Sequence, residues 1–386
     1  MQSGISFIII TIFKWYNVSS VSIEEHIIII FIYLGQIREK VKKFLVTGGA
    51  GFIGSYLVDA LLKKNENVTV FDNLSSSNQY MISNSMKGPN YSLIKADMLD
   101  EISLLEAIKE CNIVFHLAGN SDISLGTSDT KIDYQQNLLA TYNLLEAMRN
   151  STSCKRIIFA STSTVYGEAK KMPTPEDYSP LMPISLYGGC KLASEILIST
   201  YCHMFNMSGV AVRLANVVGP NATHGVIYDF IHKLSSDTES LEILGDGTQT
   251  KSYLYIDDCI NALMLAATQS IGTFQPFNVG SNDTINTIDI ANIVINQLKL
   301  ENVKVRLTYG VEGRGWLGDV KQMLLDCSKI NELGWRAKRN SREAITFAVH
   351  GILSRLQRNT VNTFEIDNNR ISIYGSSPVH KSKQQE

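Results

Sequence analysis

Short apolar segments recur through the middle of the chain, and each ends in small, hydroxyl-bearing or acidic residues. These segments are residues 43–47, 67–71, 91–96, 113–119 and 156–160. Continuous apolar runs of this length are typical of parallel strands that are covered on both faces. Helical periodicity follows the first run over residues 55–64, where Leu57, Ala60 and Leu61 fall on one side. The alternation predicts an α/β fold with a doubly wound parallel sheet.

The second half of the chain predicts a smaller lobe. Residues 224–230 begin a helix after a loop at Pro220, and residues 241–258 are expected to form a strand, a tight turn and a strand. We expect a cofactor lobe over residues 42–215 that also receives later segments near 252–290. Residues 216–355 are expected to form mainly a C-terminal substrate-binding lobe.

Both ends of the chain depart from this pattern. Residues 1–41 hold two apolar runs, 5–13 and 27–34, each far shorter than the ~20 residues that span a bilayer. Three interpretations of this atypical extension stay open: a start placed too far upstream, which is favoured, a membrane-associating anchor, and a packing arm. Residues 356–386 are polar and aperiodic, which predicts a disordered tail.

The composition is that of a globular protein. The chain has 386 residues, 44% of them hydrophobic and 19% charged, which excludes wholesale disorder and a fibrous repeat. A formal net charge of −2 supplies no field that attracts nucleic acid. The six cysteines form no CxxC pair and no cluster with histidine at metal-ligand spacing. We therefore predict reduced thiols, no metal site and a cytoplasmic location.

The first apolar run leads into Gly48, Gly51 and Gly54, with a predicted helix after them. Glycines at this spacing permit a tight turn and a close approach of the backbone to a pyrophosphate, which the helix N-terminus attracts. The second run ends at Asp72, whose carboxylate can accept hydrogen bonds from ribose hydroxyls and repels a 2′-phosphate. The pattern predicts a dinucleotide site that favours NAD over NADP.

Two further strand ends extend the same site. Asp97 closes the third run at a position suited to an adenine contact, and the small residues that end the fourth run let the backbone lie against a cofactor. His116, within that fourth run, is expected to have a structural role beside the cofactor.

A hydroxyl cluster and a Tyr-x-x-x-Lys pair follow in order. Thr162 lies in the Ser/Thr cluster that ends the fifth run, and Tyr187 and Lys191 are four residues apart. On a helix this spacing places both side chains on one face, where an ammonium group stabilises phenolate and lowers the tyrosine pKa from about 10 toward neutrality. The pair predicts a general base near working pH.

Over residues 43–350 the chain resembles the NAD-dependent epimerase/dehydratase family of extended short-chain dehydrogenases/reductases, the UDP-glucose 4-epimerase type most of all. The motifs that add to the turn and the Tyr-Lys pair are HLAG from His116, Asn137 leading into NLLEAM, and RLANVVGP from Arg213. The resemblance implies a Rossmann-type sheet, NAD, a nucleotide-sugar substrate, and a homodimer formed through the helices at 137–149 and after Ser185.

The resemblance also implies roles for individual positions. Tyr187 would take the proton of the sugar 4-hydroxyl while hydride passes from C4 to NAD, and Thr162 would bind the substrate hydroxyl. Lys191 would bind ribose, and Asn137 would support the active-site water and the lysine. The implied cofactor-binding residues are Gly48, Gly51, Phe52, Ile53, Gly54, Asp72, Asn73, Asp97, Met98, Leu117, Ala118, Gly119, Asn137, Tyr187 and Lys191.

On the substrate side the resemblance implies four further contacts. Asn216 would touch the phosphate region, and Arg314 would make a forked contact to the pyrophosphate. Lys251 stands where the family usually has arginine, so the positive charge is kept but the bidentate hydrogen bonding of a guanidinium group is lost. Asp319 would hold the loop of Arg314 or a ribose hydroxyl.

The residues after Thr162 separate the reactions of the family. Dehydratases carry an Asp-Glu pair there, and UDP-glucuronate decarboxylases carry a glutamate just before VYG, whereas this chain has Ser163 and Thr164. Without a carboxylate for elimination, the resemblance implies 4-epimerisation of a UDP-hexose, with hydride returning to the other face of a 4-keto intermediate. Two alternatives stay open: a nucleotide-sugar dehydrogenase, reductase or dehydratase that releases its product, and a non-catalytic NAD(H)-sensing protein.

Overall fold

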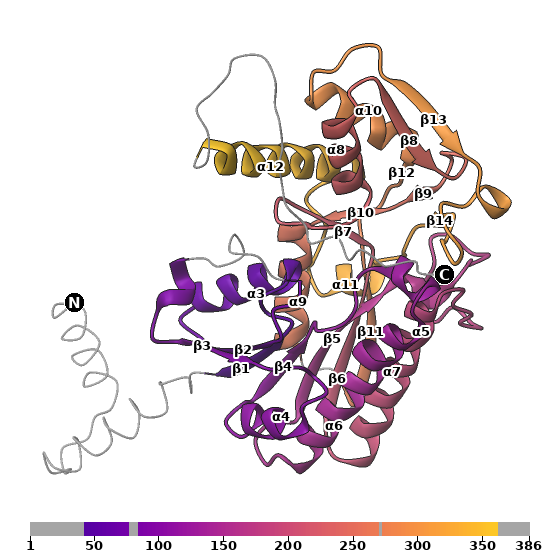
Figure 1. Cartoon of the computed structure of the whole chain (residues 1–386). Helices are drawn as coiled ribbons and strands as arrows, with labels where there is room; N and C mark the ends of the chain where they lie inside the picture. Colours follow the sequence, from indigo (N-terminus) through magenta and orange to yellow (C-terminus); the bar gives the residue numbers. More distant parts are fainter. Residues whose placement is uncertain (1–41, 77–83, 270–271, 362–386) are drawn as a thin grey trace, which may run out of the picture. The chain divides into compact units, whose positions relative to one another are not determined.

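Seven parallel strands form the central sheet in the order β11-β6-β5-β4-β1-β2-β3 (Figure 1). The structure is a computed structural model that describes residues 42–76, 84–269 and 272–361. In sheet order the strands are β11 (Phe274–Val279), β6 (Ser208–Leu214), β5 (Arg156–Thr162), β4 (Ile113–His116), β1 (Lys43–Thr47), β2 (Asn67–Asp72) and β3 (Tyr91–Lys95). Because the strand order runs outward from β1 in both directions, the predicted doubly wound, Rossmann-type fold is confirmed.

Helices cover both faces of this sheet. α3 (Phe52–Lys63) and α9 (Ile256–Thr268) pack on one face. α4 (Glu101–Ile108), α6 (Ala140–Asn150) and α7 (Leu186–Met204) pack on the other. Neighbouring strand residues divide between the two cores: Val46 packs with the first helix pair and Leu45 with the second set. Both faces are covered, which is why these strands are apolar at successive positions.

A smaller lobe has a hydrophobic core of its own. Its helices are α8 (Val226–Ser236), α10 (Thr287–Gln297) and α12 (Ser341–Val361). Its strands are β7 (Asn216–Val218) paired with β10 (Tyr253–Tyr255), β8 (Ser240–Leu244) paired with β13 (Lys304–Thr308), and β9 (Thr250–Lys251) between β12 (Ile285–Asn286) and β14 (Gln322–Met323). Between two segments that belong to this lobe, the chain forms α9 and β11, which are part of the sheet half. The lobe is therefore discontinuous in sequence.

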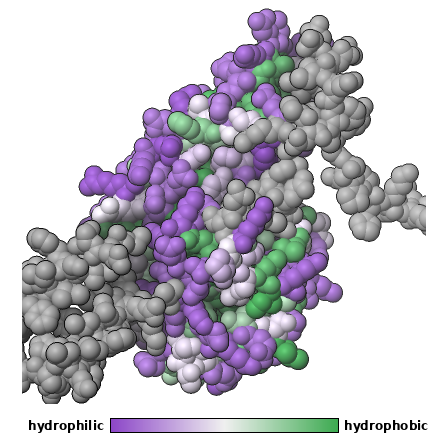
Figure 2. All heavy atoms as spheres, turned by 90° about the vertical axis from the view of Figure 1, so that its left-hand side faces the viewer, coloured by the Kyte–Doolittle hydropathy of each residue, from purple (hydrophilic) through white to green (hydrophobic). Residues whose placement is uncertain are grey.

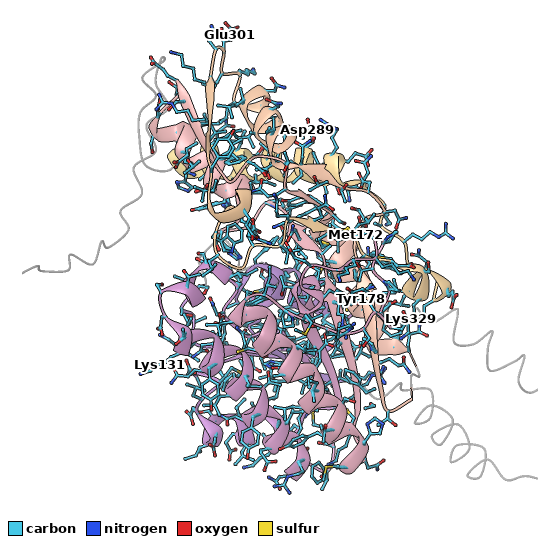
Figure 3. The ribbon with its side chains drawn as sticks, turned by 90° about the vertical axis from the view of Figure 1, so that its right-hand side faces the viewer. Lys131, Met172, Tyr178, Asp289, Glu301 and Lys329 are labelled. Carbon is cyan, nitrogen blue, oxygen red and sulfur yellow. The ribbon has the colours of Figure 1, made fainter. Side chains whose placement is uncertain are left out.

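Short helical elements complete the described structure. They are η2 (Asn84–Lys87), η3 (Ile123–Thr127), α5 (Thr130–Asp133), the π-helix η4 (Tyr134–Leu139), η5 (Ser163–Tyr166), η6 (Val311–Gly313) and α11 (Ser328–Glu332). Several hydrogen bonds link late segments to the sheet half. Among them, Thr174 N donates to Leu324 O at 2.9 Å, and Lys329 Nζ donates to Pro276 O at 2.8 Å. Figure 3 labels Lys329 beside Met172 and Tyr178 on this side of the molecule.

Three segments differ from the sequence prediction. Residues 253–258 are not one strand, because β10 ends at Tyr255 and the carboxylates of Asp257 and Asp258 lie in the first turn of α9, where they favour a helix N-terminus. The helix predicted at 137–149 begins as the π-helix η4. α12 continues through Val361, past the predicted start of the tail. Residues 1–41 and 362–386, which hold the rest of the extension and tail predictions, lie outside the described residues.

One face of the molecule is mostly polar. Figure 2 shows a largely hydrophilic face on which apolar side chains are scattered in small groups. In the ranges that the structure describes, no helix is both long and apolar enough to cross a membrane. All six cysteines are free thiols.

Candidate active site

A cavity of about 850 Å³ lies along the carboxyl ends of the central strands, with the lobe forming its other wall. Seventeen of the predicted site residues line it. They are Gly48, Gly51, Phe52, Ile53, Gly54, Asp72, Asn73, Met98, Leu117, Ala118, Gly119, Thr162, Tyr187, Lys191, Asn216, Lys251 and Asp319. Asp97, Asn137 and Arg314 are not part of this wall.

The glycine turn lies against the end of β4 with no space for side chains. Gly48 has φ +69°, and a Cβ there would lie 2.7 Å from the backbone nitrogen of Ala118. A Cβ on Gly54 would overlap the carbonyl oxygen of Gly48. Gly51 is the N-cap of α3 and has no side chain to satisfy the first-turn N–H groups. The turn is therefore a backbone cradle at a helix N-terminus, which fits the pyrophosphate of a dinucleotide.

Asp72 is held in place by the backbone beside this cradle. Its Oδ2 accepts from Ala50 N at 2.9 Å and its Oδ1 from Leu74 N at 2.8 Å. Each carboxylate oxygen keeps a lone pair for a ribose hydroxyl. Asp97 accepts from Asn73 Nδ2 at 2.8 Å, so it reaches the cavity through Asn73, which lines it.

The hydroxyl cluster and α7 bring Thr162 and Tyr187 together. Ser185 caps α7 by accepting from Gly188 N at 3.1 Å, so Tyr187 is in the first turn at the end of β5. A hydrogen bond with Thr162 lowers the pKa of Tyr187, but burial outweighs it and raises that pKa to about 12. The phenol is therefore protonated at neutral pH in the structure as it stands.

Burial dominates the pKa of Tyr187 in this structure, so the phenol does not have the near-neutral pKa that the sequence predicted from its pairing with Lys191. The Nζ of Lys191 is 5.8 Å from the centre of the Tyr187 ring and donates to Ala160 O at 3.1 Å. Burial lowers the pKa of Lys191 to about 8, against the opposing charge of Asp133. The sequence shows the spacing of the pair, but burial of both groups depends on the packing around them.

Two neighbouring residues support the site from behind the wall. Asn137 is buried in η4, and its backbone oxygen accepts from the hydroxyls of Thr141 and Ser194. His116 is fully buried between the hydroxyls of Thr47 and Thr141, and burial lowers its pKa to about 3. A neutral histidine with both ring nitrogens in hydrogen bonds has the structural role predicted for it.

The lobe wall carries an ion pair and an aromatic ring. Lys251 Nζ is 2.6 Å from Asp319 Oδ1 and 5.5 Å from the centre of the Trp316 ring, and all three residues line the cavity. Asn216 hydrogen bonds to Tyr253, whose pKa is raised mainly by burial. Sequence reasoning missed Trp316, because an aromatic residue in a loop has no signal of its own.

Arg314 is held by groups outside the cavity wall in this structure, and its contact to a pyrophosphate stays a prediction. Its guanidinium forms ion pairs with Glu168 and Glu312 and donates to the backbone oxygen of Asp319 at 2.6 Å. It therefore holds the 312–319 loop against the segment after the hydroxyl cluster, outside the cavity wall. The sequence could not show this, because Glu168 is 146 positions away from its partner.

No carboxylate follows Thr162 in the wall. Ser163 and Thr164 line the cavity there, and the carboxylates of the wall are at Asp72, Asp122, Asp229 and Asp319. Among the residues that the structure describes, no three His, Cys, Asp or Glu side chains are grouped so that they could hold a metal ion. Proton transfer in this part of the cavity thus depends on hydroxyl, phenol and ammonium groups.

Comparisons with known proteins agree with this geometry. The model of the NAD dependent epimerase/dehydratase family matches residues 44–280. A UDP-glucose 4-epimerase of Mycolicibacterium smegmatis is 30% identical over 323 residues, which cover 81% of this chain and 99% of the relative. UDP-glucuronic acid decarboxylase 4 of Arabidopsis thaliana is 28% identical over 330 residues, or 83% of this chain and 70% of the relative.

A solved structure is similar over the same range. The crystal structure of a UDP-galactose 4-epimerase has a TM-score of 0.73 and 40% sequence identity, and the match covers 81% of this chain and 99% of that one.

Proposed function

The chain belongs to the NAD-dependent epimerase/dehydratase family, and we propose that it is a nucleotide-sugar 4-epimerase that acts on UDP-hexoses such as UDP-glucose and UDP-galactose. The observation that carries this proposal is the group of Thr162, Tyr187 and Lys191 at the end of β5, with Ser163 and Thr164 rather than carboxylates beside it. Elimination and decarboxylation need an additional acid or base at these two positions, whereas epimerisation does not.

The cofactor half of the cavity fits NAD. NAD, when bound there, would supply the acceptor and donor for the hydride at C4 of the sugar. Gly48, Gly51 and Gly54 would hold the pyrophosphate at the N-terminus of α3, and Asp72 would bind the ribose hydroxyls. We also assign Lys191 to the nicotinamide-side ribose, since its ammonium lines the wall near Tyr187.

The proton of the sugar 4-hydroxyl is assigned to Tyr187. Its phenol and the hydroxyl of Thr162 are hydrogen bonded to each other and both line the cavity, so a substrate hydroxyl can join them. Lys191, with a pKa of about 8, is an ammonium at neutral pH and favours phenolate when substrate enters. Thus Tyr187 is the proton acceptor and later the donor.

The nucleotide diphosphate is assigned to the lobe wall. Lys251 supplies positive charge to the lobe wall and is paired with Asp319. When the substrate binds, its ammonium group would contact both this carboxylate and a phosphate group. The names of the relatives and of the solved structure, a UDP-glucose and a UDP-galactose 4-epimerase, support uridine diphosphate as the carrier. A homodimer and a cytoplasmic location stay predictions; Tyr142 of α6 and Ile196 of α7 are exposed apolar residues on the helices expected to pair.

The test is NMR of purified protein with UDP-glucose or UDP-galactose and no added NAD. Interconversion at C4 that is lost in Tyr187→Phe supports the proposal and shows that cofactor is retained through purification. Net formation of NADH when NAD⁺ is supplied would instead indicate that the protein is a dehydrogenase. Binding of NAD(H) without turnover of any of these sugars would favour a sensing protein.

A further inference from the structure

Asp133 is a buried carboxylate beside the proposed site that the sequence reading did not include. It ends α5 just before the π-helix, and none of its surface is exposed. Its Oδ1 accepts two hydrogen bonds of 2.9 Å, from Asn120 Nδ2 and Asn137 Nδ2. Its Oδ2 has no hydrogen-bond partner in the described structure and lies against Gly126, where a Cβ would overlap it. A carboxylate in such a place is unfavourable unless a positive charge compensates it.

Lys191 is the buried cation of the same region. It is 4% exposed, and no ion pair within 4 Å joins it to a carboxylate among the described residues. Burial raises the pKa of Asp133, whereas its hydrogen bonds with Asn120 and Asn137 and the charge of Lys191 lower it. Burial lowers the pKa of Lys191, and Asp133 is the largest of the charges that raise it. Each buried charge therefore compensates for part of the free-energy cost of removing the other from water, although the two groups form no ion pair.

The side chain of Asn137 spans the gap between them. Its Nδ2 donates to Asp133, and its Oδ1 lies against Gly119. A Cβ on Gly119 would overlap this oxygen and would lie 3.4 Å from Lys191 Nζ. Asn120, the other amide bound by Asp133, lines the cavity. One carboxylate thus anchors an amide that lines the cavity, Asn120, and an amide that lies behind its wall, Asn137.

We propose that Asp133 is a positioning residue whose negative charge keeps Lys191 in its ammonium form and whose Oδ1 holds Asn120 and Asn137 in place. Its relevance to catalysis rests on the proposed function, since that function assigns Lys191 to the support of Tyr187. The coupling of the two charges does not depend on the reaction, so it can be tested separately.

The titratable groups that face Asp133 are Asp122 in the loop after β4, and Tyr187, Cys190 and Lys191 on α7. Loss of the negative charge lowers the pKa of Lys191, because the carboxylate favours its charged form. It also lowers the pKa of Tyr187, because the carboxylate disfavours phenolate. Both shifts have the same direction, so the pH profile of kcat moves to lower pH, whereas a packing defect lowers kcat without moving the profile.

Asp133→Asn separates charge from hydrogen bonding, because its Oδ1 still accepts from both amides. The titration of Lys191 is followed by NMR in protein labelled with ¹³C and ¹⁵N at the lysine side chains, with the signal assigned by its loss in Lys191→Met. We expect the Lys191 midpoint, about 8 in the wild type, to fall by about one pH unit, a tenfold weaker proton affinity.

Asp129→Asn is the matched control. Asp129 is an exposed carboxylate that caps the same helix, and asparagine caps equally well, so we expect no shift of the Lys191 midpoint. Asp133→Ala should show the same shift as Asp133→Asn, together with a raised KM, because Asn120 loses its anchor. It replaces Asp133→Asn as the test variant if the latter does not fold.

An unchanged Lys191 midpoint on loss of the carboxylate, or an equal shift in Asp129→Asn, overturns the proposal whether or not the enzyme is active. A shifted midpoint in a protein that epimerises no sugar nucleotide supports the charge coupling and contradicts the proposed function instead.

Discussion

The two walls of the cavity are built in different ways. The sheet wall lies at the ends of parallel strands, and its cofactor-binding turn is backbone in close contact, with Gly48 packed against Ala118. The lobe wall consists of long side chains such as Lys251 and Trp316, which come from short strands and loops (Figure 1). A local pattern specifies the first wall because strand, turn and helix are adjacent in sequence. The second wall depends on pairings between distant segments, which no local pattern shows.

The strongest test of the sheet wall is Tyr187→Phe. Removal of the phenol hydroxyl leaves the ring and the fold but abolishes proton transfer, so we expect kcat to fall by about 10²- to 10⁴-fold. The measurement is the rate of C4 interconversion by NMR.

Tyr201→Phe is the control on the same helix. Its hydroxyl donates to Glu146 at 2.6 Å and the residue does not line the cavity. An equal loss of activity in both variants would contradict the assignment of Tyr187 as the proton acceptor.

The second test compares a buried ion pair of the sheet half with an exposed one. Arg213 and Glu195 form a buried pair with two forked contacts, the shorter at 2.7 Å, and Arg213 also donates to Tyr166. Arg213→Met leaves the carboxylate of Glu195 buried without its cation, so we expect the free energy of unfolding to fall by about 3–5 kcal/mol.

The exposed pair of Arg149 and Glu146 gives the matched measurement. Arg149→Met should lower the free energy of unfolding by less than ~1 kcal/mol, because water screens that pair. The free energy of unfolding of each variant is measured by urea denaturation. Similar losses would mean that burial does not distinguish the two pairs.

The third test concerns the glycine turn. In Gly48→Ala, the added Cβ meets the backbone of Ala118 at a positive φ that alanine rarely adopts. We expect NAD affinity, measured by calorimetry, to fall about tenfold to a hundredfold.

Gly189→Ala is the matched substitution, since a Cβ there has no atom within 4 Å and the residue is inside α7. It should leave NAD binding unchanged and raise the free energy of unfolding by up to ~1 kcal/mol. Weaker binding in this variant would show that the glycine effect is not local to the turn.

The smallest effect separates Lys251 from Arg314. Lys251→Met should raise KM for the sugar nucleotide about tenfold, because Lys251 is in the wall. Arg314→Met should change KM less and lower stability instead, because Arg314 holds Glu168 and the 312–319 loop. If Arg314→Met has the larger effect on KM, Arg314 rather than Lys251 makes the main phosphate contact, as the sequence resemblance implies.

The sequence predicts the strands and the glycine turn of the sheet wall, but not other lining residues such as Asn120 and Asp122. The five apolar runs correspond to β1 to β5, and the glycine turn, Asp72 and Tyr187 all line one cavity. Each of these motifs is short and continuous in the chain, so the sequence displays it directly.

The features that the sequence does not show share a physical cause. Arg314 forms an ion pair with Glu168, and burial raises the pKa of Tyr187. Asp133 is four residues before Asn137, a helical spacing that the sequence does display, but its charge matters only because it is buried near Lys191. In each case the decisive quantity is burial or a distant partner, and both arise only when the chain is folded.

The central claim is that hydride removed from C4 returns to the same carbon on its other face. The direct measurement uses UDP-glucose that carries deuterium at C4, incubated with purified protein without added NAD, followed by NMR of the products. Our account predicts UDP-galactose that keeps the deuterium at C4, with no label in solvent and none accumulating on NAD. Product that has lost the C4 deuterium, or deuterium that leaves on released cofactor, would contradict it.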